Sequence, residues 1–369
     1  MPQHNPQNER IKRQYFTYLK EAMRHSEATV DQVAKALARF EADTGYRDFK
    51  AFRPEAAVAF KRRLAEQVSR TTGGRLSKAT LYSTLTNLKK FFHWLAGQPG
   101  YRSRLRFADA EYFNLSDKDT RVATARRERP FPTLEQVKHV VATMPTASDV
   151  QRRDRAIVAL MLLTGARDGA VVSMKLKHVD LADDKIYQDA RDVDTKNSKS
   201  FNTYFFPVGD DIKAIVVEWV AFLRRELLWG NDDPLFPSTA VVVGEDSLFR
   251  ADGLRREHWR SGDPIRGVFR RAFEAAGLSY FNPHLLRKTL VQLGERLCQT
   301  PEHFKSWSQN LCHEGVLTTF SSYGAVSSSR QREIIRGLDQ RPAEGPLSVQ
   351  AIARAVAAEL RNAGAQERA

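Results

Sequence analysis

The stretch PHLLRKT, residues 283–289, places His284 and Arg287 three positions apart in a part of the chain that reads as helical. Residues three apart lie on one face of a helix, so the two side chains are expected to point the same way. Such a pair offers an imidazole and a permanently charged guanidinium to one site. The pair arises often by chance, so its meaning depends on the motifs around it.

Two motifs of related chemistry flank this pair. Upstream, LLTGAR, residues 162–167, ends in Arg167, just past a helix and at a Thr-Gly break. Downstream, LCHEGVLTTFSSY, residues 311–323, carries His313 and, ten residues later, Tyr323. Each motif alone is weak, because a lone arginine or tyrosine is usually structural.

A predicted β-hairpin lies between the first two motifs. Residues 185–208 alternate polar with β-branched or aromatic side chains around the polar turn KNSK, residues 196–199. The turn carries two lysines, Lys196 and Lys199, either of which can serve an active site.

The order arginine, hairpin lysine, His-x-x-Arg, histidine, tyrosine resembles that of the tyrosine recombinases, the phage integrase family. The resemblance covers residues 9–340 and is strongest in 155–180 and 280–325. It implies a mainly α fold with a small antiparallel β-sheet. It also implies a helical core-binding domain and an integrase-type catalytic domain that together form a C-shaped clamp on DNA.

The resemblance assigns six catalytic residues, which are Arg167, Lys196, His284, Arg287, His313 and Tyr323. Lys199 competes with Lys196 for the role of the catalytic lysine. The chain departs from the family at Ala170, Cys312 and Lys288, where glutamate, glycine and histidine are usual. The spacing from His313 to Tyr323 is also one residue longer than the commonest one. The alanine is expected to loosen support of Arg167.

These residue types suit the cleavage of a DNA phosphodiester. Two guanidiniums can clamp the non-bridging oxygens of the transition state without a metal. Tyr323 would attack phosphorus and conserve the bond energy in an ester, so ATP is not required. His284 is the expected base, the lysine the donor of a proton to the leaving 5′ oxygen, and His313 a phosphate ligand. We expect no cofactor and no metal, since no glycine-rich phosphate loop and no HExxH motif occurs.

The positive charge is concentrated in the first third of the chain. The whole chain of 369 residues has 58 Lys and Arg and 44 Asp and Glu, a formal charge of +14. Residues 1–130 hold 26 of these bases and 14 of the acids, a surplus of +12, which leaves +2 for the other 239 residues. This asymmetry indicates a polyanion-binding region on a nearly neutral body. The predicted DNA contacts are Lys61, Arg62, Arg63, Arg75, Lys78, Lys89 and Lys90.

Several classes of protein are excluded. The longest apolar run, residues 156–163, is far shorter than the ~20 residues that cross a bilayer. The polar N-terminus has no apolar region of a secretory signal, and Cys298 and Cys312 are too few for a disulfide scaffold or a cysteine-rich zinc site. We expect a cytoplasmic, nucleoid-associated protein with no membrane partner.

The sequence predicts five segments. Residues 1–8 are a disordered start, 9–115 a helical core-binding (SAM-like) domain, 116–130 a linker, 131–340 the catalytic domain and 341–369 a tail with an amphipathic helix. In the first domain, apolar stripes at Val30, Val33, Ala34, Leu37 and Phe40, and from Leu81 to Leu95, predict two helices.

The prediction is a site-specific DNA recombinase that acts on double-stranded DNA as a homotetramer on paired sites, in the service of a mobile genetic element. The alternatives are a catalytically silent DNA-binding relative and a type IB topoisomerase-like enzyme. Five of the assigned residues, Arg167, Lys196, His284, His313 and Tyr323, also have a structural interpretation; for Arg167 it is an ion pair with Asp168 or Asp180. The target sequence, the choice among integration, resolution and transposition, and docking of the tail in cis or in trans stay open.

Overall fold

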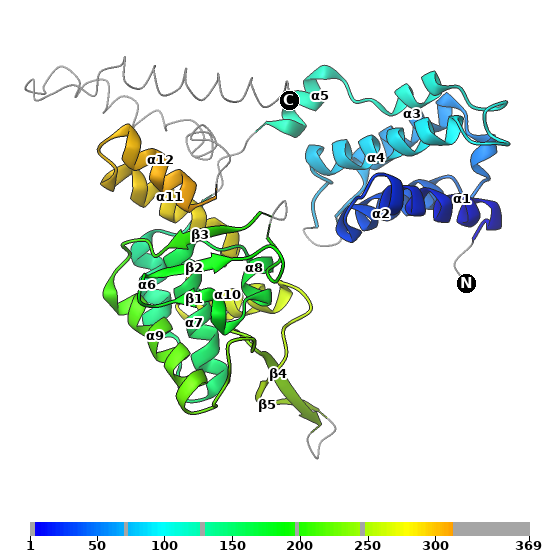
Figure 1. The fold of residues 1–369 in the computed structure, drawn as a ribbon. Helices are drawn as coiled ribbons and strands as arrows, with labels where there is room; N and C mark the ends of the chain where they lie inside the picture. The colour runs from blue at the N-terminus through cyan, green and yellow to red at the C-terminus, as the bar shows by residue number, and fades with distance from the viewer. Residues whose placement is uncertain (1–3, 70–72, 126–129, 196–198, 244–247, 313–369) are drawn as a thin grey trace, which may run out of the picture. The chain divides into compact units, whose positions relative to one another are not determined.

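The computed structural model describes residues 4–69, 73–125, 130–195, 199–243 and 248–312. The chain divides into two compact units, Met1–Arg126 and Arg127–Ala369. Each unit has a hydrophobic core of its own, and most elements are helices (Figure 1). The expected fold class, mainly α with a small antiparallel sheet, is confirmed.

The named elements of unit 1 are all helical, and an isolated antiparallel bridge joins Val68 to Arg75. Its elements are α1 (Pro6–Thr17), the π-helical turn η1 (Tyr18–Ala22), α2 (Glu27–Asp43), η2 (Phe49–Ala51), α3 (Pro54–Glu66), α4 (Lys78–Ala96), η3 (Phe107–Phe113) and α5 (Asp117–Thr124). The predicted stripe on α2 is buried except at Ala34, which is half-buried while Ala36 is buried in its place. Helix α4 begins after the cap Ser77, ends at Gly97 as its sequence predicts, and buries its stripe in the same core.

The structure differs from the predicted disordered start. Helix α1 begins at Pro6, and the side chain of Asn5 caps it by accepting from Gln7 N and Asn8 N. Asn8 is fully buried and donates to Glu41 Oε1 at 3.1 Å. A polar N-terminal sequence is therefore ordered by capping and by a buried amide that pairs with α2, which hydrophobic periodicity does not reveal.

The structure also differs from the predicted linker in its first half. Ser116 caps helix α5, which packs against α4, and Asp119 forms an ion pair of 2.8 Å with Lys78. None of the residues of α5 is buried, so the helix has no apolar stripe that the sequence could display. The division between the units falls at Arg126 and Arg127.

Unit 2 contains both sheets of the described chain. Its elements are α6 (Leu134–Thr143), α7 (Asp149–Thr164), α8 (Asp168–Ser173), η4 (Leu176–His178), β1 (Val179–Asp180), β2 (Lys185–Gln188), β3 (Phe201–Tyr204), α9 (Asp210–Arg225), β4 (Ser238–Val243), β5 (Phe249–Arg255), α10 (Asp263–Ala275), η6 (Pro283–Leu285), α11 (Leu286–Leu297) and α12 (Pro301–Asn310). None of the described helices is both long enough and apolar enough to span a membrane.

Helix α7 is the centre of unit 2. Every side chain from Ala156 to Leu163 is at most 2% exposed, and α6, α9, α10 and α11 all pack against this helix (Figure 1). The longest apolar run of the sequence is therefore a helix surrounded by other helices. The last turn of α7, which ends at Thr164, and the following Gly165 are therefore held inside unit 2.

The predicted hairpin is confirmed. Strands β2 and β3 pair antiparallel, with Ile186 opposite Thr203, and β1 extends the sheet on the other side of β2. Phe206 N donates to Leu163 O at 2.7 Å, which ties the exit of the hairpin to the end of α7.

A second hairpin, β4 with β5, was not predicted. The run TAVVV at residues 239–243 carries the β-branched residues that favour a strand, and Val241, Val242 and Val243 are exposed. Arg153, a buried residue of α7, holds the base of this hairpin by donating to Thr239 Oγ1 at 3.0 Å and to Pro237 O at 2.9 Å.

Candidate active site

The first motif forms a tight turn between two helices. Gly165 ends α7 in the left-handed conformation, with φ of 61°, and its N–H donates to Met161 O at 2.9 Å. A Cβ at this glycine would lie 2.9 Å from Leu311 Cδ2 and 3.0 Å from Leu290 Cδ1. Glycine is therefore required here for two reasons, the left-handed backbone conformation and the close approach of these two leucines. Two residues later Arg167 occupies the position just before the short helix α8, without a capping hydrogen bond from its side chain.

Arg287 joins all three motifs. Its guanidinium donates from Nη1 to Gly165 O at 2.7 Å and from Nη2 to Leu311 O. The side chain is 7% exposed. The turn after α7, the start of α11 and the residues just before His313 thus meet around one cation, although more than one hundred residues separate the first from the others.

The two arginines lie close enough to interact electrostatically. Burial, with the charge of Arg167 as the second cause, lowers the pKa of Arg287 to about 10. Among the described residues, neither Arg167 nor Arg287 has an acidic partner. The structural interpretation of Arg167 as an ion-pair partner is not supported, because Asp168 pairs with Arg266 at 2.8 Å and Asp180 with Lys185 at 3.3 Å. Two guanidiniums without a local counter-charge form a site for an anion.

His284 lies just before the helix that carries Arg287. It belongs to the 3₁₀ turn η6, which continues directly into α11, and Asn282 caps the turn by accepting from His284 N at 3.0 Å. The imidazole is exposed, whereas Arg287 in the next turn is buried. In the His-x-x-Arg pair, the imidazole of His284 is therefore exposed, whereas the guanidinium of Arg287 joins the motifs.

Three of the six predicted catalytic residues, Lys196, His313 and Tyr323, lie outside the described residues. The residues next to two of them are described. Thr195, which precedes Lys196, is buried, whereas Lys199 at the other end of the turn is exposed. Leu311 and Cys312 immediately precede His313, with Cys312 at a φ of 52°.

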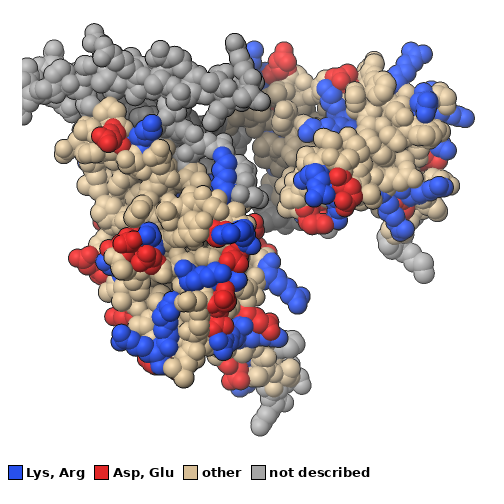
Figure 2. Space-filling model, viewed as in Figure 1, with Lys and Arg blue, Asp and Glu red and all other residues tan. Residues whose placement is uncertain are grey.

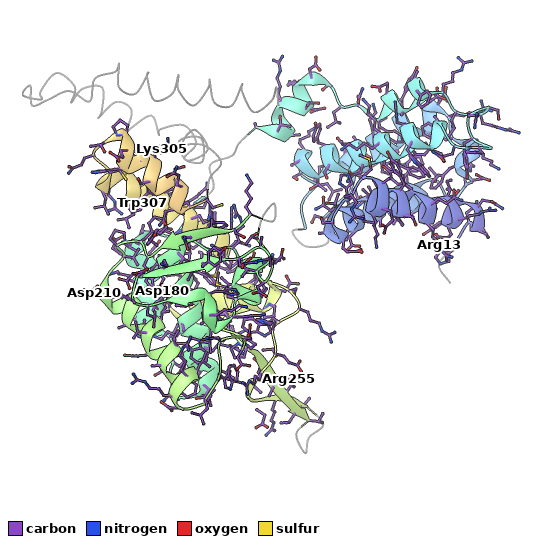
Figure 3. All side chains as sticks on the ribbon, in the orientation of Figure 1. Arg13, Asp180, Asp210, Arg255, Lys305 and Trp307 are labelled. Atoms are coloured by element: carbon purple, nitrogen blue, oxygen red, sulfur yellow. The ribbon has the colours of Figure 1, made fainter. Side chains whose placement is uncertain are left out.

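Asn310 ties the end of α12 to β3, a contact that the sequence did not predict. Its side chain accepts from Tyr204 N at 2.7 Å and donates to Tyr204 O at 2.8 Å, as a paired strand would. Trp307, also on α12, donates to Leu290 O at 3.1 Å and so attaches this helix to α11 (Figure 3). The end of α12, which leads to His313, is therefore tied both to β3 and to α11. No sequence motif marks Asn310, because an asparagine at a helix end is ordinary.

The seven predicted DNA contacts fall into two groups. Four make polar contacts within unit 1: Lys61 with Asn114 O, Arg63 with Asp43, Lys78 with Asp119, and Lys89 with Glu111. Arg62, Arg75 and Lys90 are exposed, and none of the described acidic residues pairs with them. Lys and Arg side chains project from the visible face of unit 1 (Figure 2).

Residues 131–327 match the family model described as "Phage integrase family". The chain belongs to the phage integrase family. Members of this family are tyrosine recombinases, and the chain is accordingly a DNA strand transferase. The matched segment contains all three motifs and the hairpin.

Known proteins are similar to this chain in sequence and in fold. Tyrosine recombinase XerC of Lactobacillus delbrueckii subsp. bulgaricus is 24% identical over 318 residues, which are 84% of this chain and 92% of XerC. The fold of this integrase family member is similar to that of a lambda integrase dimer bound to a core site, with a TM-score of 0.59, 16% identity and coverage of 87% of this chain and 96% of that one. It is also similar to XerH recombinase in a post-cleavage complex with difH, with a TM-score of 0.55, 16% identity and coverage of 89% and 85%.

Proposed function

We propose that this integrase family member is a site-specific DNA recombinase that cleaves and rejoins DNA through a transient 3′-phosphotyrosine at Tyr323. The observation that carries the proposal is the meeting of Arg167 and Arg287, without an acidic partner among the described residues, beside the segment that leads to His313 and Tyr323. An anionic phosphodiester fits such a site.

The reaction proceeds as a balanced transesterification. The phenolic oxygen of Tyr323 attacks phosphorus as its proton passes to His284, and the bond from phosphorus to the 5′ oxygen breaks. A lysine of the turn, Lys196 or Lys199, gives a proton to the leaving oxygen. Arg167 and Arg287 stabilise the charge on the non-bridging oxygens, and His313 donates a hydrogen bond to the phosphate. The number of phosphoester bonds is unchanged, so no ATP is consumed.

Unit 1 is proposed as the core-binding domain and unit 2 as the catalytic domain. The surplus of +12 in residues 1–130 supports the first assignment. Double-stranded DNA is the proposed partner, in line with the DNA-bound lambda integrase and XerH structures. We further propose that the chain acts as a homotetramer on paired sites and that it works on the nucleoid in the cytoplasm. We also propose that it serves a mobile genetic element. The likeness in fold to the Tn1549 transposon integrase, with a TM-score of 0.54, supports the role in a mobile element.

A nicked suicide substrate tests the chemistry, because the broken strand diffuses away and traps the covalent adduct. The wild-type chain is expected to form a protein–DNA adduct, and Tyr323→Phe to bind equally well but form none. Tyr204→Phe is the matched control: this tyrosine is 54% exposed on β3 and should leave the adduct unchanged. An adduct with Tyr323→Phe would show that the nucleophile is another residue.

Paired DNA sites then separate a recombinase from its alternatives. The expected result is strand exchange that depends on both sites. Adducts with relaxation of supercoiled DNA but no exchange would indicate a topoisomerase-like enzyme, and binding without any adduct would indicate a catalytically silent relative.

A further inference from the structure

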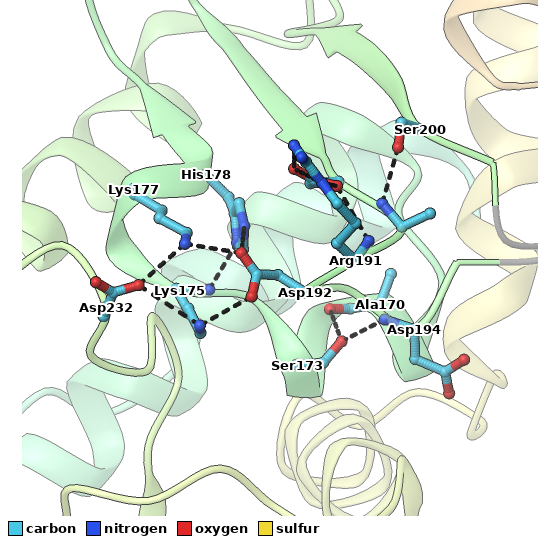
Figure 4. Close-up of polar contacts among 12 residues, drawn as sticks. Ala170, Ser173, Lys175, Lys177, His178, Arg191, Asp192, Asp194, Ser200 and Asp232 are labelled. Atoms are coloured by element: carbon cyan, nitrogen blue, oxygen red, sulfur yellow. Dashed lines mark hydrogen bonds and ion pairs between the residues drawn. The ribbon is translucent and has the colours of Figure 1, made fainter.

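An acidic residue anchors the segment that leads into the lysine turn. Asp192 Oδ1 accepts from Lys175 Nζ at 2.9 Å, and Asp192 Oδ2 lies 2.7 Å from Lys177 Nζ (Figure 4). Both ammonium groups also contact Asp232, at 3.5 and 3.0 Å, so the lysines join two separate segments. Hydrogen bonds from Lys177 and Lys175 hold the pKa of Asp192 far below its usual range. The carboxylate is therefore charged, and the anchor intact, at neutral pH.

A serine fastens the same segment two residues later. Asp194 N donates to Ser173 Oγ at 2.8 Å, and that hydroxyl lies 3.1 Å from both Gly169 O and Ala170 O (Figure 4). Between the two anchors, Val193 is buried in the core of unit 2. Three consecutive residues are thus held by an ion pair, by packing and by a main-chain hydrogen bond.

The far side of the turn is also attached. Ser200 Oγ accepts from Ala190 N at 2.9 Å, which closes the segment across its base. Lys196 follows Asp194 by two residues, and Lys199 directly precedes Ser200. Because one residue spans at most ~3.6 Å, the attachment of Ser200 limits how far the neighbouring backbone of Lys199 can move.

Helix α8 connects these anchors to the phosphate site. Arg167 directly precedes its first residue and Ser173 is its last residue. One short helix therefore carries an arginine proposed to bind the phosphate and the hydroxyl that fastens the lysine segment. Any movement of the segment relative to α8 changes the distance from lysine to phosphate.

We propose that Asp192 and Ser173 are positioning residues. They hold the proton-donating lysine of the 196–199 turn at the right distance from the phosphate that Arg167 is proposed to bind. This inference rests on the proposed function, which assigns the lysine as the donor of a proton to the leaving 5′ oxygen. It adds two residues that touch neither the DNA nor the reacting atoms but act through the lysine.

The test compares ordinary DNA with DNA that carries a 5′-bridging phosphorothiolate, whose sulfur leaves without protonation. Asp192→Ala and Ser173→Ala are each expected to slow cleavage of ordinary DNA by about 10- to 100-fold, because a displaced lysine protonates poorly. Both are expected to cleave the phosphorothiolate at wild-type rates. Asp192→Glu should recover part of the rate on ordinary DNA, since its carboxylate can still reach the two lysines.

Asp183→Ala is the matched control. Asp183 pairs with Lys185 near the other end of the same sheet but does not anchor the turn segment, so this variant should cleave both substrates normally. Equal slowing of both substrates by Asp192→Ala and Ser173→Ala would overturn the proposal and assign them a general structural role. Normal cleavage of ordinary DNA by both would overturn it as well.

Lys196→Ala and Lys199→Ala, measured in parallel, separate this inference from the proposed function. If one lysine variant is rescued by the phosphorothiolate while the Asp192 and Ser173 variants are not, the proton donor stands and the positioning role is wrong. If neither lysine variant is rescued, the assigned proton donor is wrong, and the positioning role is wrong with it.

Discussion

At the scale of single residues, Arg287 has an architectural role beside the chemical role proposed for it. Its guanidinium donates to the carbonyl oxygens of Gly165 and Leu311 and lies close enough to Arg167 for the two charges to interact. Arg167 has no such architectural contact among the described residues. The two arginines should therefore respond differently to the same substitution.

Arg167→Ala and Arg287→Ala are each expected to lower DNA cleavage by roughly 10²-fold or more, as for the loss of a donor to a transition-state oxygen. Only Arg287→Ala should also lower the melting temperature, because two buried carbonyls lose their partner at about 1–3 kcal/mol each. Single-turnover cleavage and thermal unfolding check both points. Equal melting temperatures for the two variants would contradict the architectural role of Arg287.

Gly165 is expected to tolerate no side chain. Gly165→Ala adds a Cβ where Leu311 and Leu290 already lie, and it places alanine at a φ of 61°. The control is Gly277→Ala, at a φ of 71° with nothing within 4 Å of the new Cβ. The control should lose about 1 kcal/mol of unfolding free energy and keep its activity. Gly165→Ala should lose more and also slow cleavage, and similar losses in both variants would show that only the backbone conformation matters.

At the scale of elements, the connection of α8, η4 and the β2–β3 hairpin contains a buried histidine. His178 Nδ1 accepts from Lys175 N at 2.9 Å, and Nε2 is buried without a hydrogen-bond partner, 3.6 Å from Asp192 Oδ2. Burial lowers the pKa of His178, and the charge of Asp192 opposes that shift. The ring is therefore neutral in the folded chain at neutral pH, with Nδ1 as an acceptor.

The free energy of unfolding should consequently fall as the pH drops below about 6.5, where the unfolded histidine binds a proton that the folded one does not. Protonation of Nδ1 would break the bond from Lys175 N. His178→Asn keeps an acceptor oxygen without the proton site and should flatten this dependence below about pH 6.5. Exposed His139→Asn is the control, and chemical denaturation at several pH values is the measurement. A slope that His178→Asn leaves unchanged would assign the acid sensitivity to other groups.

At the scale of the whole molecule, affinity for DNA should come mainly from basic residues that are not neutralised within the chain. The triple variant of Arg62, Arg75 and Lys90 to alanine is expected to make the log–log salt slope of duplex binding less negative by about 2.7. The control triple, Arg63, Lys78 and Lys89 to alanine, removes cations that already pair with acids of unit 1 and should change the slope less. A larger effect of the control triple would show that DNA displaces these pairs.

The C-terminal tail, residues 341–369, bears on assembly of the whole molecule, because it is expected to dock either on its own domain or on a neighbouring protomer. Residues 341–369 lie outside the described residues, and their apolar positions Leu347, Ile352, Val356 and Leu360 recur at helical spacing. If the tail docks on a neighbouring protomer, deletion of residues 345–369 should preserve binding to one site and weaken cooperative binding to paired sites. Normal synaptic complexes after deletion would indicate docking in cis.

The sequence by itself determined what depends on neighbours along the chain. Helices α2 and α4 follow from apolar periodicity, the turn before Arg167 from Thr-Gly, and the β2–β3 hairpin from alternation around a polar turn. The order of the motifs also identified the family, because the chemistry of phosphate transfer requires these residue types whatever surrounds them.

Only the tertiary structure decided which groups meet. It buried Arg287 against the carbonyls of Gly165 and Leu311, and it paired Arg63 with Asp43 and Lys61 with the carbonyl of Asn114. It also showed that α1 and α5 are helices, which their caps and their packing stabilise rather than an apolar stripe. The physical reason is distance along the chain. The sequence around a basic residue does not show whether its side chain faces solvent or pairs with an acid 20 positions away, because only folding brings such partners together.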